Sequence, residues 1–183
     1  QPNIAYWNLY CLAQALLPLI GEQDDALAAL ESYKTVFPAS FEARLRDKLG
    51  WREARPGDGE RIDGTLRLLA QQRVDFTIFW RRLSLAAGNA DYGPVRDLFM
   101  DRRAFDDWLP GYLSRAQADG GTPDAALMLR SNPKFVLRNH LGQQAIDKAQ
   151  AGDMSEVSTL QRLLERPFDE HPGHDAYADF PPD

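Results

Sequence analysis

The sequence predicts an all-α fold, with one multi-helix domain over residues 1–165 and an extended, acidic, proline-rich tail over residues 166–183. Apolar residues recur at steps of three and four almost everywhere, whereas the alternation typical of strands is scarce. Apolar residues make up 44% and charged residues 26% of the chain, as in ordinary globular proteins. A chain of 183 residues can bury about 70% of its unfolded surface, so it needs no metal or disulfide to fold.

The first two helices are predicted over residues 4–17 and 24–49, where apolar side chains form stripes along one face. Pro38 lies inside the second stretch. Because proline lacks an N–H and disfavours helical angles at the preceding Phe37, we expect a kink or a break there. Gly50 follows and is typical of the residue that ends a helix.

A polar, glycine-rich loop at residues 55–59 separates these helices from a third one, predicted over residues 62–85. A turn then leads to a short apolar stretch at residues 95–99. Asp101 is expected to cap a helix over residues 102–118, because its side chain can accept a hydrogen bond from the first turn.

Two dipeptides are strong helix-start signals, at Thr122 and at Asn132, because each is followed by proline. Thr or Asn can cap the helix, and proline fits its first position. The second signal is predicted to open a helix that runs to about residue 149. Asp153, with Glu156 three residues later, resembles a capping box before a last helix.

The charge balance restricts the class of partner. The chain carries 21 basic and 27 acidic residues, a formal net charge of −6. We expect no nucleic-acid partner, because phosphate neutralisation needs a concentrated basic surface. We expect no membrane partner either, since no apolar run reaches the roughly 18 residues of a membrane span, and residues 4–20 lack the basic flank of a signal peptide. Because Gln1 rather than Met opens the chain, we expect it to begin inside a larger protein.

The histidines and the cysteine are the first candidates for chemistry. His171 and His174 lie among acidic residues; a metal site is one interpretation, but a solvated turn is favoured because no helix orients the pair. His140 falls beside an apolar stripe, which favours helix packing over a catalytic base. The lone Cys11 excludes a disulfide within the chain, and its apolar helix face predicts a buried, inert thiol.

Three basic residues at four-residue steps, Arg130, Lys134 and Arg138, form a positive strip if one helix runs through them. Such a strip could bind a phosphate or an acidic partner surface. A solvated or ion-paired face is the favoured interpretation, because this is what most surface charges do.

The remaining candidates point to no catalytic site. The loop at residues 57–59 lacks the glycines and the preceding strand of a dinucleotide-binding loop. The carboxylate pairs Asp24–Asp25 and Asp106–Asp107 fall in predicted first turns, where the helix dipole explains them. The residues by themselves therefore indicate no complete catalytic constellation.

Several stretches together resemble the selenoprotein O family, in order and along nearly the whole chain. They are Gln1–Leu9, Arg44–Gly50, Asp75–Ser84, Asn132–Leu141 and Arg166–Glu170. The resemblance implies a kinase-like fold, of the pseudokinase type, that transfers AMP from ATP to Ser, Thr or Tyr of other proteins with Mg or Mn.

The resemblance also implies what this chain lacks. The family's nucleotide-binding, metal-binding and catalytic residues lie before Gln1, so we assign no catalytic, cofactor-binding or metal-binding residue here and expect the chain alone to be inactive. Residues 1–20 would belong to the end of the kinase-like lobe, and the rest would form the C-terminal helical part. The implied partners are that upstream lobe and the protein substrates, and the implied location is cytoplasmic.

An alternative function is a stand-alone helical module that binds another protein through exposed tryptophans. Tryptophans in helical stripes are core residues more often than contact residues. The candidates are Trp7, Trp51, Trp80 and Trp108.

Overall fold

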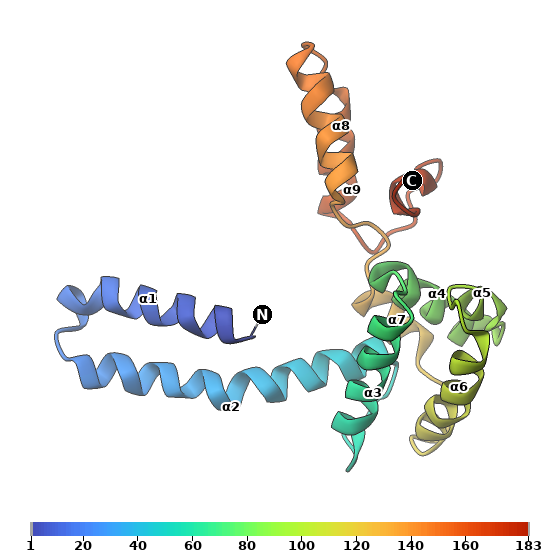
Figure 1. The fold of residues 1–183 in the computed structure, drawn as a ribbon, viewed down its shortest axis with the longest axis horizontal. Coiled ribbons are helices and arrows are strands. Elements are labelled where there is room, and N and C mark those ends of the chain that lie inside the picture. The colour runs from blue at the N-terminus through green and yellow to red at the C-terminus, as the bar shows by residue number, and fades with distance from the viewer. Residues whose placement is uncertain (1, 183) are drawn as a thin grey trace. The chain divides into compact units, whose positions relative to one another are not determined.

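A computed structural model describes residues 2–182, and in this range it contains helices and no strand, which confirms the all-α prediction (Figure 1). Contacts divide the chain into two compact units, one ending at Arg44 and one beginning at Leu45. This division differs from the predicted one, which placed residues 1–165 in a single domain. No helix among the described residues is both long and apolar enough to span a bilayer.

The first unit is a pair of helices, α1 (Pro2–Ile20) and most of α2 (Gln23–Lys48). Gly21 joins them with a φ of 91°, a conformation that glycine adopts without strain. Of the kink or break expected at Pro38, the break is wrong, because α2 continues through this residue. The Phe37 ring stacks on the Tyr33 ring and on the Phe41 ring, with centroid distances of 5.1 and 5.7 Å. This stacking helps to hold together the helical turns on either side of Pro38.

The second unit contains the remaining helices, joined by short connections. They are α3 (Asp58–Gln71), α4 (Phe76–Asn89), α5 (Gly93–Arg96), α6 (Arg102–Gln117), α7 (Ala125–Ser131), α8 (Asn139–Gln150), α9 (Ser155–Glu165) and the 3₁₀ helix η1 (Asp175–Ala178). The core lies among α3 to α7 and is rich in large side chains, including Trp51, Phe79, Trp80, Phe105 and Met128.

The predicted third helix over 62–85 is corrected to two helices. α3 ends at Gln71, Arg73 has a left-handed φ of 53°, and α4 begins at Phe76. Asp75 starts α4, because its side chain accepts a hydrogen bond of 2.9 Å from the backbone N–H of Ile78. The apolar stripe is interrupted only by Gln72 and Arg73 and resumes at Phe76, so the predicted helix was carried across the junction.

The helix start predicted at Asn132 is also wrong. Asn132 is extended and fully buried, and α8 begins only at Asn139. Its side-chain amide donates to the Lys48 carbonyl at 3.0 Å and to the Ser84 hydroxyl at 2.9 Å. Asn132 therefore ties α2 to α4 instead of capping a helix.

Two smaller corrections concern the other start signals. Asp124, and not Thr122, caps α7 by accepting a hydrogen bond from the N–H of Leu127. The capping box predicted at Asp153 forms only in part: the Asp153 side chain accepts a hydrogen bond of 2.9 Å from the Ser155 N–H. The Asp153 N–H donates to the Lys148 carbonyl instead of to Glu156, whose carboxylate accepts from the Lys148 ammonium at 2.7 Å. The prediction that Asp101 caps α6 is confirmed by its hydrogen bond from Arg103.

The tail is less extended than predicted. It contains η1, and the Pro167 carbonyl accepts hydrogen bonds from the backbone N–H groups of Lys134 and Phe135 at 2.7 and 3.0 Å. Residues 166–182 therefore pack within the second unit.

Candidate functional site

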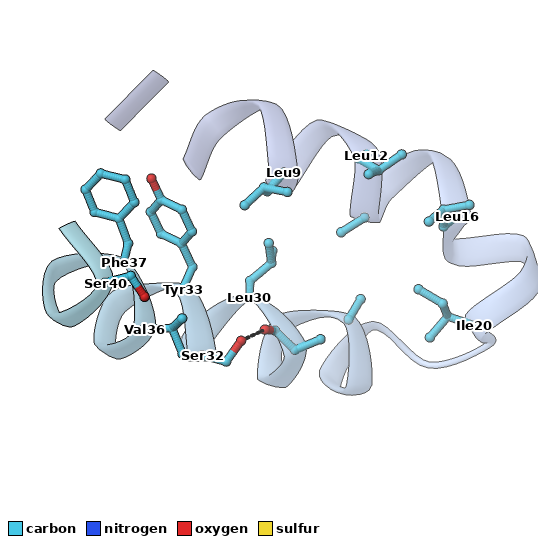
Figure 2. A pocket seen from close by; sticks show the side chains of 13 residues that line it. Leu9, Leu12, Leu16, Ile20, Leu30, Ser32, Tyr33, Val36, Phe37 and Ser40 are labelled. Carbon is cyan, nitrogen blue, oxygen red and sulfur yellow. Dashed lines mark hydrogen bonds between the residues drawn. The ribbon is translucent and has the colours of Figure 1, made fainter. Parts of the chain in front are cut away.

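The first unit contains an apolar groove of about 550 Å³ between α1 and α2 (Figure 2). Its walls are almost entirely apolar; among them are Leu9, Leu12 and Leu16 from α1 and Leu30, Val36 and Phe37 from α2. Two polar groups on its lining are already used, since the Ser32 hydroxyl donates to the Ala29 carbonyl and the Tyr33 hydroxyl donates to the Pro2 carbonyl. The groove therefore suits an apolar surface and not a charged ligand.

Apolar side chains of α1 outside the groove are exposed as well. No described residue of α1 is buried, and Ile4, Trp7 and Leu19 are 64%, 63% and 84% exposed. Cys11 is half-buried, so the prediction of a buried thiol is corrected. Exposed apolar patches of this kind mark interaction surfaces in soluble proteins.

A buried ion-pair network holds the second unit together at the start of α3 and the end of α6. The Arg115 guanidinium donates to both carboxylate oxygens of Asp58, at 2.6 and 2.9 Å, and to Asp119 at 2.9 Å. Asp58 is fully buried, and the side chains of Arg115 and Asp119 are 3% and 6% exposed. The sequence placed Asp58 in a polar loop and gave no signal for this pairing.

The network shifts the acidity of its carboxylates. Burial alone would raise the pKa of Asp119, but hydrogen bonds from Arg55, the backbone of Glu53 and Arg115 outweigh it and lower the pKa to about 2. Burial and the Arg115 hydrogen bonds oppose each other in the same way at Asp58, where the pKa falls below its usual value. Both groups are therefore held as carboxylates whose partners are supplied by the fold.

Lys134 and Arg138 do not form the predicted helical strip with Arg130, because α7 ends at Ser131 and both lie in the segment that follows. Arg138 donates two hydrogen bonds to Asp75, at 2.7 and 3.1 Å. Lys134 donates to Glu170 at 2.7 Å and to Asp175 at 2.6 Å. The ion-paired interpretation is confirmed for these two residues, which tie the connection after α7 to α4 and to the tail.

The histidines of the tail do not converge on a common point. The His171 Nε2 lies 2.9 Å from the Arg166 carbonyl, and the His174 Nε2 lies 2.9 Å from the Arg162 guanidinium. Within residues 2–182 no cluster of three or more His, Cys, Asp or Glu side chains is placed to hold a metal ion. His140 is half-buried on α8.

The acidic pairs and the tryptophans have structural positions. Asp24 and Asp25 lie in the first turn of α2, as predicted. Asp106 and Asp107 do not lie in a first turn, because α6 begins at Arg102; Asp106 is instead paired with Arg96 through two hydrogen bonds of 2.7 Å. Trp51, Trp80 and Trp108 belong to the core of the second unit or pack against it. Among the four tryptophans, Trp7 is the one with a largely exposed ring.

Comparison with known proteins adds a family to this geometry. The family described as "Protein adenylyltransferase SelO" matches residues 1–165. Relatives named "Protein nucleotidyltransferase YdiU" are 63% identical in Variovorax paradoxus, 58% in Albidiferax ferrireducens and 46% in Herminiimonas arsenicoxydans. Each alignment covers the whole of this chain but only 37–38% of the relative, so the chain spans little more than a third of their length.

Proposed function

This chain belongs to the family of the protein adenylyltransferase SelO, and from that premise we propose that it is the C-terminal helical part of an enzyme that transfers AMP from ATP to hydroxyl groups of proteins. In that reaction a Ser, Thr or Tyr oxygen bonds to the α-phosphorus, pyrophosphate leaves, and the hydroxyl proton passes to a base. Mg or Mn bound with ATP would neutralise phosphate charge. The proposal places the reacting groups in a kinase-like lobe and the whole enzyme in the cytoplasm.

The role of this segment in the proposal is to support that lobe. The observation that carries it is the apolar surface of the first unit, where the groove and the exposed ring of Trp7 have few polar groups to offer a ligand. A kinase-like lobe of the same polypeptide is the proposed occupant. In the second unit, Arg115, Arg138 and Lys134 are engaged with carboxylates of this chain, which supports a structural role for them.

The test compares this segment with a longer polypeptide in which it is joined to the other two-thirds found in its relatives. Each is incubated with Mg and ATP labelled at the α-phosphate, and AMP incorporation into protein is measured. The longer polypeptide should incorporate label and the segment should not. Labelling by the segment alone would contradict the proposal.

A matched pair of variants tests the supporting surface in the longer polypeptide. Leu19 on α1 and Met100 in the second unit are 84% and 86% exposed. Leu19→Asp should lower AMP incorporation, because it would place a charge in the proposed contact, whereas Met100→Asp should leave it nearly unchanged. Equal effects of the two substitutions would argue against the role of the first unit.

The alternative function is a helical module that binds a separate protein, which the 63% exposed ring of Trp7 favours. In that case Trp7→Gln would abolish binding of that protein by this segment alone. AMP transfer by the longer polypeptide would instead favour the enzyme.

A further inference from the structure

The second unit contains a separate cavity of about 400 Å³ between α3 and α6. Its walls include the rings of Trp51, Trp108 and Tyr112. The Trp108 and Tyr112 rings are stacked, with centroids 4.9 Å apart and planes within 10° of parallel. The volume falls within the range of roughly 300–1,000 Å³ that is usual for small-molecule sites, and aromatic walls are typical of them.

Two helix-interior glycines line this cavity, Gly64 on α3 and Gly111 on α6. Neither has a positive φ, and a Cβ atom at either position would meet no heavy atom within 4 Å. Glycine destabilises a helix interior by about 1 kcal/mol relative to alanine. Since neither the backbone nor close packing requires glycine here, its effect is to keep the cavity wide.

The rim of the cavity carries opposite charges on the two helices. Arg61 on α3 and Asp107 on α6 both line it and are both exposed. Among residues 2–182 the structure gives neither side chain an ion-pair partner, whereas Arg115 and Arg138 are each paired with a carboxylate. Arg61 and Asp107 therefore add a cation and an anion to a cavity that also has an aromatic wall.

The wall itself contains one unsatisfied donor. Trp51 is 2% exposed, and its indole N–H has no acceptor among the described residues. The Trp108 N–H, in contrast, donates to the Thr65 hydroxyl at 3.0 Å. The Thr65 hydroxyl in turn donates to the Arg61 carbonyl at 2.9 Å. The Trp51 N–H is itself fully enclosed, so it is not available to a ligand in the cavity.

We propose that this cavity binds a small aromatic zwitterion of the size of an amino acid. The ligand ring would pack against the half-buried Trp108, since Tyr112 is only 2% exposed. The carboxylate would pair with Arg61, and the ammonium would pair with Asp107. This binding is independent of AMP transfer, because it uses residues that the proposed function leaves without a role.

The test titrates unlabelled L-tryptophan into the ¹⁵N-labelled 183-residue chain and follows the four indole N–H signals by NMR. The signals of Trp51 and Trp108 should shift with saturation, while those of Trp7 and Trp80 should not. Absence of saturable shifts, or equal shifts of all four signals, would overturn the proposal. Indole alone, which lacks both charges, should bind several-fold more weakly, because each of the two exposed ion pairs contributes up to about fivefold in affinity.

Filling the cavity provides the matched control. Gly64→Leu and Gly111→Leu should each abolish the shifts, whereas Gly142→Leu, in the interior of α8 and away from this cavity, should leave them unchanged. Arg61→Gln and Asp107→Asn should each weaken the binding of L-tryptophan by about two- to fivefold and leave the binding of indole unaffected. Shifts that survive both cavity-filling substitutions would overturn the site, and equal binding of L-tryptophan and indole would overturn the proposed charge pairing.

Discussion

Removing the Arg115 side chain should destabilise the second unit more than removing any charge from its surface. Arg115 donates two hydrogen bonds to Asp58, one to Asp119 and one to the Glu53 carbonyl, at 2.6–2.9 Å. Arg115→Met keeps most of the volume but leaves the fully buried Asp58 without its charge partner. Breaking a buried pair in this way costs about 3–5 kcal/mol.

Urea unfolding measures this loss, with the fluorescence of the buried Trp51 as the probe, since the Arg115 guanidinium lies 5.0 Å from its ring. Arg102→Met is the matched control, because Arg102 pairs with Asp97 at the surface, with side chains 58% and 59% exposed, and should change stability by less than about 1 kcal/mol. The double variant Asp58→Leu/Arg115→Met should recover much of the loss, because no lone charge remains buried. Equal destabilisation by Arg115→Met and Arg102→Met would refute the reasoning.

Three further predictions concern acid, the tail and the first unit. The pKa of Asp119 is about 2 in the folded chain against a usual 3.8, so its ionised form stabilises the fold by about 2 kcal/mol above pH 4. This stabilisation is lost as the pH falls towards 2. The free energy of unfolding should therefore fall less steeply with decreasing pH in Asp119→Asn. Arg138→Ala should lower the stability measured by thermal unfolding by about 1–3 kcal/mol, because it breaks two hydrogen bonds to the largely buried Asp75. Lys134→Ala should cost less, because the carboxylates that pair with Lys134 are exposed. The reverse order would contradict the assigned pairs. Trp7→Gln should reduce binding of a hydrophobic dye to this segment, whereas unchanged dye fluorescence would show that the exposed stripe of α1 is not the site of dye binding.

The sequence predicted the existence of most helices because apolar periodicity reports which face is buried. It did not place the junction at Asp75, because the break in the apolar pattern at Gln72 and Arg73 is short and the capping aspartate is one acidic residue among 27. Asn132 shows the opposite failure. The Asn-Pro pair is a genuine local start signal, but the buried amide makes bonds to Lys48 and Ser84 that are far away in the sequence.

The functional features also fall into two groups, those that the sequence determined and those that only the tertiary structure decided. The sequence by itself determined the all-α class, the apolar character of α1 and the family, because each depends on residue types in order along the chain. The tertiary structure alone decided which charges are paired, since Arg115 reaches Asp58 across 57 positions and Arg138 reaches Asp75 across 63. Such pairs, like the cavity between α3 and α6, depend on how helices pack, and no local pattern encodes that packing.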